Sequence, residues 1–236
     1  MRFLVFQLVA PLSAWGDVAV GQYRGSRDAP SESALIGLLA AALGIRRDDE
    51  AAHAGLRDGY ALAVGTVQTG SLLRDYHTAQ TPSRGDLKAR PHRTRRDELA
   101  VPKHQLNTIL STRDYRQGGE WVVAVQALPG ATHELAALQG ALREPRFLLY
   151  LGRKSCPPAA PLGPQVIETD SALDAMLGWL QAAGSSAKLR SLAWDDRATA
   201  GTAAHLSVPR RDRLIRRKGW LFGDRTEHVA LLAEGD

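Results

Sequence analysis

The order of apolar segments on either side of one polar stretch limits the fold of this chain more than any other feature. Residues 2–9 and 60–68 are rich in β-branched, aromatic and aliphatic side chains, which is typical of buried strands. Between them, residues 34–43 lack charged side chains and predict a deeply buried helix, capped by Ser31 or Ser33. The first part of the chain therefore predicts a β-α-β unit.

A second β-α-β unit follows the polar stretch. Residues 120–127 predict a strand, residues 132–143 predict an amphipathic helix capped by Thr132, and residues 147–151 predict another short strand. Two such units in this order form the split βαβ pattern. We therefore expect an α+β fold with a ferredoxin-like, RRM-like βαββαβ body.

The polar stretch at residues 69–119 separates the two units. It is rich in Gly, Pro, Thr and Arg, and its apolar periodicity is weak. A structureless segment of this length is unusual inside a compact domain. We expect an insertion with its own hairpin or short helix, ordered by a partner.

Four prolines between residues 157 and 164 indicate a linker after this body. The chain beyond the linker predicts a helix at 171–182 and strands at 188–194, 205–208 and 228–233. We expect two units, a body at residues 1–156 and a small, mostly β C-terminal subdomain at residues 157–236.

Length, cysteine content and apolar runs indicate a cytoplasmic protein. A chain of 236 residues can bury a core of its own, and a lone Cys156 fits a reducing compartment. Gln7 and Leu12 interrupt the pattern of a signal peptide at the N-terminus. The apolar run at 34–45 spans about 18 Å as a helix, which is too short for a bilayer.

Positive charge is concentrated in two short segments. Residues 84–103 carry a net +4 and residues 210–218 carry a net +5, while the whole chain carries +5. The rest of the chain is therefore acidic overall. This distribution indicates a docking surface for a polyanion, although two solvated loops would give the same pattern.

Several chemistries lack the residues that they need. The chain contains neither a phosphate-binding G-x-x-x-x-G-K-[ST] motif nor a G-x-G-x-x-G motif. Its seven histidines are scattered, and a single cysteine makes a zinc site improbable. We therefore expect no metal and no cofactor.

Residues 146–157 combine features that suit a phosphate backbone. Gly152 allows close approach of backbone N–H groups, and Arg153 and Lys154 supply positive charge beside the Ser155 hydroxyl. Tyr150 has a ring on which a base can stack. An ordinary turn with a buried tyrosine explains the same residues.

Two shorter segments carry candidate residues of their own. Lys103 and His104 are suited to acid–base chemistry on an RNA 2′-hydroxyl, or are simply exposed. Arg113 is suited to stacking on a base or gripping a phosphate, or pairs with its neighbour Asp114.

Tyr76 and His77 form a third candidate segment, close to Arg74 and Asp75 in the sequence. One interpretation is a contact patch for nucleic acid. The other is a packed pair at the base of the insertion.

Five blocks of the sequence, in the same order, are similar to those of one known family. They are residues 8–16, 30–45, 73–78, 111–115 and 150–157. On these blocks the chain resembles the CRISPR-associated CasD subunits of type I-E Cascade complexes, within the RAMP superfamily. The C-terminal third matches weakly, and the 116–121 segment departs from the family's usual Leu-x-Asp-Ala-x-Phe pattern.

The resemblance implies a specific role. Such subunits have a ferredoxin-like body with a thumb, here residues 69–119, and hold the 5′ handle of the CRISPR RNA. They cap the filament of backbone subunits and abut the large subunit, close to target DNA. The RNA-binding residues that it implies are Arg113, Tyr150, Gly152, Arg153, Lys154 and Ser155, with Tyr76, His77, Arg27 and Ser33 completing the expected set.

Two other functions are compatible with the residues. Related type I-C subunits resemble this chain and cut CRISPR repeat RNA without a metal. In that case Lys103 and His104, with Tyr76 or His77, would form the catalytic centre. A third hypothesis is an interaction protein with no RNA role. We expect a non-catalytic RNA-binding subunit.

Overall fold

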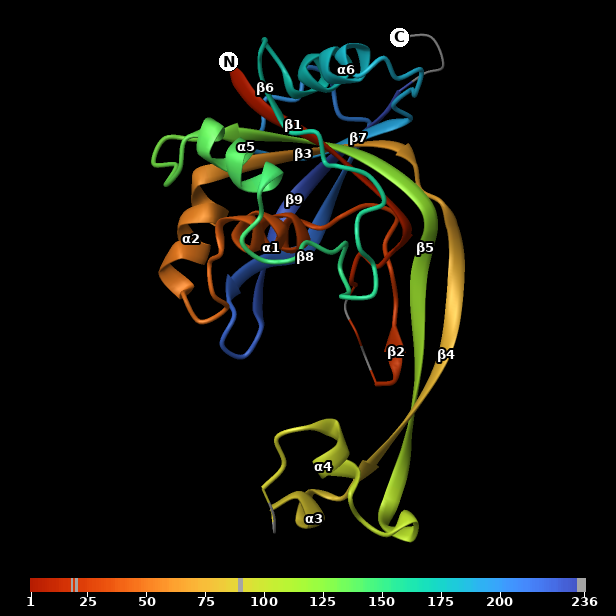
Figure 1. Ribbon diagram of the computed structural model, residues 1–236. Helices are drawn as coiled ribbons and strands as arrows, with labels where there is room; N and C mark the ends of the chain where they lie inside the picture. The colour runs from red at the N-terminus through yellow and green to blue at the C-terminus, as the bar shows by residue number, and fades with distance from the viewer. Residues whose placement is uncertain (18, 20, 89–90, 233–236) are drawn as a thin grey trace.

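The computed structural model describes residues 1–17, 19, 21–88 and 91–232, and strands from the whole of this length join in one sheet (Figure 1). Hydrogen-bonded neighbours follow the order β6-β1-β5-β3-β7-β9-β8, and β2 and β4 also pair with β5. The strands are β1 (Arg2–Ser13), β2 (Tyr23–Arg24), β3 (Tyr60–Gln68), β4 (Ser71–Pro82), β5 (Leu106–Ala127), β6 (Gln165–Glu168), β7 (Ser191–Asp195), β8 (Leu206–Arg216) and β9 (Leu221–Leu231).

Helices cover both faces of the sheet. They are α1 (Glu32–Leu43), α2 (Glu50–Gly59), α3 (Arg84–Lys88), α4 (Arg95–Leu99), α5 (Leu135–Arg143) and α6 (Ala172–Ala182), with a short 3-10 turn, η1 (Lys103–Gln105). Figure 1 shows α1, α2 and α5 on one side of the sheet and α6 on the other.

The alternation of side chains along β1 divides the core into two layers. Phe6 and Leu8 face α1 and α5, whereas Phe3 and Val5 face α6. All four side chains are almost completely buried. Because both faces of β1 are apolar and covered, the strand contributes to both core layers, with β6 and β5 as its neighbours in the sheet.

The predicted first helix is confirmed, together with its cap. The Ser31 hydroxyl accepts a hydrogen bond from the Ala34 N–H at 3.2 Å, which satisfies one of the free donors at the start of α1. At the other end Gly44 has a φ of 77°, and its N–H donates to the last carbonyls of the helix.

The 69–119 segment forms a long antiparallel hairpin. Strands β4 and β5 pair from Ser71 opposite Gln117 to Pro82 opposite Leu106. In Figure 1 this hairpin leaves the body and ends in a tip built from α3, α4 and η1. The expectation of a hairpin is confirmed, and the strand expected at 120–127 is the inner end of the same β5.

The prediction of a strand at 147–151 is wrong. The backbone N–H groups of Arg146 and Phe147 donate to Ala42 and Ala41 at the end of α1, so they are unavailable to a neighbouring strand. The strand beside β1 is instead β6, which follows the prolines and pairs from Arg2 opposite Glu168 to Val5 opposite Gln165.

Helix boundaries differ in two further places. α5 begins at Leu135 after Glu134, so Thr132 is not its cap. The helix α2 at 50–59, capped by Asp49, was not expected. It is short and polar, and it presents only a narrow apolar stripe that includes the buried Leu56.

The C-terminal strands continue the sheet. β7 pairs with β3, β9 pairs with β7, and β8 pairs with β9. Strands from both sides of residue 156 therefore belong to one hydrogen-bonded sheet. The proposed division at that residue stays a prediction. β8 and β9 are longer than expected, with residues 210–216 of the basic cluster in β8 and residues 217–218 in the turn that follows. Residue 233 of the last predicted strand lies outside the described residues.

Candidate nucleic-acid interface

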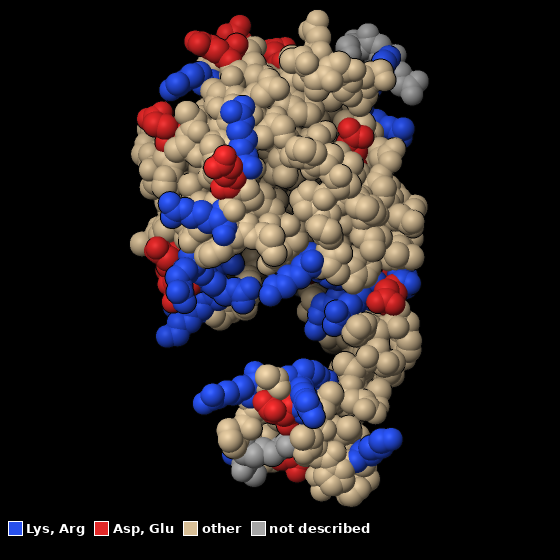
Figure 2. Space-filling view, in the orientation of Figure 1, with Lys and Arg blue, Asp and Glu red and all other residues tan. Residues whose placement is uncertain are grey.

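A groove of about 800 Å³ lies between α1, the 148–153 loop and the β8–β9 hairpin, close to β2. We call it the arginine groove, because six arginines line it. They are Arg24, Arg27, Arg47, Arg153, Arg211 and Arg217. Figure 2 shows Lys and Arg gathered along the edge of the body that faces the hairpin tip, and again on the tip itself.

The two acidic residues in the groove are already engaged. Asp17 pairs with Arg27 at 2.8 Å, and Asp212 accepts from Arg225 at 2.6 Å and from the Glu32 backbone N–H at 3.0 Å. The groove therefore keeps a net positive charge, which favours a polyanion.

Local packing requires Gly152. Its φ is +88°, and a Cβ at this position would lie 1.8 Å from the carbonyl oxygen of Ala14. The loop is held there because Ala14 N–H donates to Leu151 at 3.0 Å and Leu151 N–H donates to Cys156 at 2.7 Å. The glycine thus allows the loop to approach the end of β1 closely.

Arg153 links this loop to the base of the hairpin. Its guanidinium lies 4.4 Å from the ring centroid of Tyr115. It also donates to the carbonyl oxygens of Asp114 at 3.1 Å and Arg24 at 3.2 Å. The side chain is therefore held in one orientation, with N–H donors left for a ligand.

The remaining loop residues divide between the groove and the surface. Tyr150 is half-buried and lines the groove with Gly152 and Arg153. Lys154 and Ser155 are exposed and lie outside the groove lining. Ser33 and Arg27, from the expected set, do line it.

Asp114 at the base of the hairpin pairs with Arg74 and Tyr23. Arg74 donates to both carboxylate oxygens, at 2.9 and 3.1 Å, and the Tyr23 hydroxyl donates to one of them, Oδ2. The Arg74 guanidinium holds the pKa of the buried Asp114 carboxyl below its usual value. The alternative pairing of Arg113 with Asp114 is therefore wrong, because the carboxylate has other partners.

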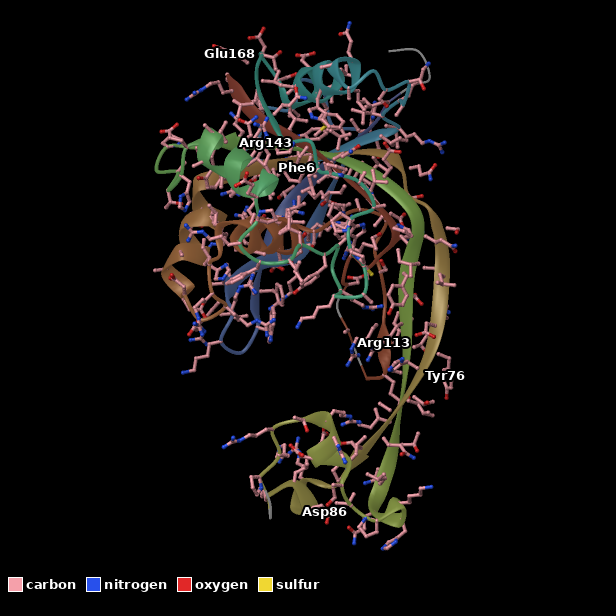
Figure 3. The ribbon with its side chains drawn as sticks, in the orientation of Figure 1. Phe6, Tyr76, Asp86, Arg113, Arg143 and Glu168 are labelled. Carbon is pink, nitrogen blue, oxygen red and sulfur yellow. The ribbon has the colours of Figure 1, made fainter. Side chains whose placement is uncertain are left out.

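The two faces of the hairpin separate the other predicted residues. Arg113 is in register with Arg24 of β2 and with Asp75 of β4, and cross-strand partners share a face. His77 lies two residues from Asp75 and therefore belongs to the same face of the hairpin. Arg24, also on this face, lines the groove. Tyr76 points to the opposite face, as Figure 3 shows.

Lys103 and His104 lie in η1 at the hairpin tip, where both are exposed. Ser111, opposite His77, is five residues from the outer end of β5, which is about 17 Å along an antiparallel strand. The structure therefore does not bring this pair together with Tyr76 or His77. Among the described residues, no group of three or more His, Cys, Asp or Glu side chains has metal-binding geometry.

The two basic clusters occupy different places. Residues 84–88 and 91–103 form the hairpin tip; residues 89–90, which include Arg90 of the cluster, lie outside the described residues. The 210–218 cluster contributes Arg211 and Arg217 to the groove, whereas its Arg213 turns inward to Glu32 at 3.1 Å.

The groove also contains residues that the sequence did not indicate individually. Arg47 follows α1 in a segment of mixed charge, and Trp220 and Phe222 follow a basic run without any recognisable motif. The charge cluster was the only signal near them. Their assembly depends on the contact of the β8–β9 hairpin with α1, which the sequence pattern does not predict.

The fold and the groove together define a mixed α/β protein with a mainly antiparallel sheet, a projecting hairpin and a basic groove. The family described as "CRISPR-associated protein (Cas_Cas5)" matches residues 3–223. The chain belongs to this family.

Individual relatives agree with this assignment. The chain is 34% identical over 170 residues to the CRISPR system Cascade subunit CasD of Escherichia coli (strain K12), covering 68% of this chain and 69% of that protein. The resemblance to CasD subunits is therefore confirmed.

Solved structures support the fold. A chain in a CRISPR RNA-guided surveillance complex aligns with a TM-score of 0.65 at 21% identity, covering 97% of this chain and 89% of that one. A structure described as a Cas protein aligns with a TM-score of 0.62 at 22% identity, covering 98% of this chain and 95% of that one. No helix among the described residues is both long enough and apolar enough to cross a membrane.

Proposed function

We propose that this protein is a structural subunit of a Cascade surveillance complex that holds the 5′ handle of the CRISPR RNA in the arginine groove. The observation that carries the proposal is the convergence of Arg27, Ser33, Tyr150, Gly152 and Arg153 on one basic groove. These residues come from two segments that are distant in sequence, and all of them belong to the set expected from the resemblance to CasD.

Arginine suits this task for physical reasons. Its planar guanidinium binds phosphate through two hydrogen bonds and also stacks on a base. Neutralising phosphates releases counterions, which supplies affinity for a single strand. The half-buried Tyr150 ring offers one surface for an unstacked base.

We further propose a ferredoxin-like body with a thumb. Support comes from the neighbouring strands β6-β1-β5-β3, with α1 following β1 and α5 following β5. This is the arrangement of a split βαβ fold in which β6 is the last strand. The β4–β5 hairpin with its tip corresponds to the thumb expected at 69–119.

The proposed protein partners are the Cascade backbone subunit and the large subunit, with target DNA nearby and the cytoplasm as the compartment. Support for the complex comes from the likeness to CasD and to a surveillance complex. The basic tip offers a second nucleic-acid surface opposite the groove (Figure 2).

We propose that the subunit has no catalytic activity of its own. Support comes from Lys103 and His104, which lie at the hairpin tip away from His77. Incubation of the purified protein with labelled repeat RNA in EDTA should leave the RNA intact. Specific cleavage that disappears in His104→Ala would instead establish the endoribonuclease alternative.

Neutralising two groove cations tests the RNA-binding role. Arg24→Gln combined with Arg211→Gln should weaken binding of handle RNA at least about tenfold. It should also make the slope of log K against log salt shallower by about 1.4, because two phosphate contacts are lost. Fluorescence anisotropy at several salt concentrations measures both quantities.

The matched control combines Arg46→Gln with Lys188→Gln. These residues are exposed and lie outside the groove, but the net charge changes by the same amount. The control should bind like the wild type. Equal weakening by both pairs would show that the RNA is held by overall charge and not by the groove.

A further inference from the structure

Trp220 is the one tryptophan of the chain that is substantially exposed. It lies in the turn between β8 and β9 and is 52% exposed, whereas the other four are each 7% exposed or less. Its φ of 53° lies in the left-handed region, which bulky side chains rarely adopt. Strained backbone of this kind is found at ligand-binding positions, so the ring merits a functional explanation.

The surroundings of this ring are cationic and aromatic. Phe222 lies parallel to it, with ring centroids 6.4 Å apart and 15° between the planes. The guanidinium carbons of Arg47 and Arg217 lie 5.6 and 5.9 Å from the Trp220 centroid. All four residues line the arginine groove.

Arg217 is hydrogen-bonded to the nearby Glu50 through its backbone and not through its guanidinium. The Glu50 carboxylate accepts the backbone N–H groups of Arg217 and Lys218, at 3.0 and 2.8 Å, and so is used on the turn itself. The Arg217 Nε is buried without a hydrogen-bond partner among the described residues. Burial, together with the charge of Arg47, lowers the pKa of Arg217.

A buried N–H donor without a hydrogen-bond partner is unfavourable, and an anion beside the Arg217 guanidinium would reduce this cost. The Arg217 guanidinium packs against α1 at Gly37. A Cβ at that position would lie 3.4 Å from its Nη2 atom. The anion would therefore enter from the open side of the groove, beside the Trp220 ring. A phosphate joined to a base meets both requirements of the site.

We propose that Trp220, Arg47 and Arg217 form a subsite for one unstacked nucleotide of a single strand, with its base on the indole and its phosphate at the two guanidinium groups. The proposal rests on the proposed function, since it extends the binding groove to the β8–β9 turn. Stacking on an aromatic ring tolerates any base, so the subsite holds a nucleotide without reading its identity.

Tryptophan fluorescence tests the stacking directly. The exposed Trp220 contributes the part of the emission that solutes reach. Titration of the full-length protein with single-stranded handle RNA should quench this emission and protect it from acrylamide. Trp220→Phe should abolish the RNA-dependent quenching, while its ring retains most of the affinity for RNA.

Removal of the ring should weaken binding. Trp220→Ala should raise the Kd for handle RNA about 5- to 150-fold, the range typical of one stacked base. Phe147→Ala is the control, because Phe147 is 46% exposed and lies outside the groove lining. Circular dichroism and thermal melting should show all variants folded.

A second matched pair tests the phosphate contact. Arg47→Gln should weaken binding and reduce the salt slope by about 0.7, whereas Arg46→Gln should leave both unchanged.

Single-stranded DNA of the same sequence tests which nucleic acid supplies the nucleotide. Binding that prefers RNA identifies the CRISPR RNA as the source of the nucleotide, and equal binding identifies any single strand.

The outcomes separate this proposal from the proposed function. Wild-type affinity and unchanged quenching in Trp220→Ala, with weakened binding in the Arg24–Arg211 double variant, would overturn the subsite alone. Absence of RNA binding by the wild-type protein would overturn both.

Discussion

At the scale of single residues, the groove depends on positions whose conformations are fixed by close packing. Gly152 permits the loop to approach Ala14, and Arg153 fastens the loop to the hairpin base. Both were predicted as phosphate ligands. The contacts show an additional positioning role that their residue types alone did not indicate.

Gly152→Ala should destabilise the protein severely. The methyl group would overlap the Ala14 carbonyl oxygen, 1.8 Å away, at a φ of +88° that alanine disfavours. We expect a loss on the order of 2–4 kcal/mol in the free energy of unfolding, measured by urea denaturation. The control Gly130→Ala also has positive φ but nothing within 4 Å, and it should lose only about 1 kcal/mol.

Asp114 should contribute to the acid sensitivity of the fold. Its folded-state pKa is depressed by Arg74, so the ionised carboxylate stabilises the protein above the unfolded pKa of about 4. This stability is lost as the pH falls through the lower folded-state pKa. Asp114→Asn should therefore be less stable than the wild type at pH 7, with a smaller further loss on acidification.

Urea midpoints measured between pH 7 and pH 2 test this prediction. Asp17→Asn serves as a control, because the Asp17 carboxylate is far more exposed. An acid-induced loss in Asp114→Asn as steep as that of the wild type would contradict the assigned role.

At the scale of elements, one buried ionic network joins the β8–β9 hairpin to the start of α1. Arg225 is 5% exposed and lies 3.3 Å from Glu32, 2.6 Å from Asp212 and 2.8 Å from Glu227. Arg213 adds a second contact to Glu32 at 3.1 Å. The network fixes the hairpin that carries Arg211, Arg217 and Trp220 into the groove.

Arg225→Met should destabilise the fold by about 3–5 kcal/mol, because it leaves buried carboxylates without their cation. Arg210→Gln removes a partly exposed ion pair with Glu227 and should lose about 1 kcal/mol or less. Equal urea midpoints for these two variants would contradict the importance of the network. Double-variant analysis with Glu32→Gln measures the coupling.

The same elements show how far the sequence alone could predict the structure. The strand at 60–68 and the first helix were predicted correctly, because dense apolar residues and local caps define them. The 147–151 strand was wrong because an extended apolar segment can bind the end of a helix instead of a ladder.

The lengths of β8 and β9 were underestimated because their arginines interrupt the apolar alternation that indicates a strand. The stems of Arg213 and Arg225 are buried while their charges are paired, a state that periodicity does not reveal. For the site, loop residues 150–153 were predicted from their chemistry. Trp220 and Arg47 were missed because a tertiary contact brings them together.

At the scale of the whole molecule, two positive surfaces face each other. The arginine groove lies on the body and the 84–103 cluster lies at the tip of the β4–β5 hairpin (Figure 2). The rest of the chain is acidic overall, so the positive electrostatic potential of the protein is concentrated on this side. A strand held in the groove would continue toward the tip.

Photo-crosslinking of the assembled complex tests the central claim most directly. A CRISPR RNA carrying 4-thiouridine at single positions of the 5′ handle would be assembled with the other subunits, irradiated and analysed by mass spectrometry. We predict cross-links from handle positions to the 148–153 loop and to the β8–β9 turn at 217–220. Handle cross-links confined to the hairpin tip or to other subunits would contradict the account.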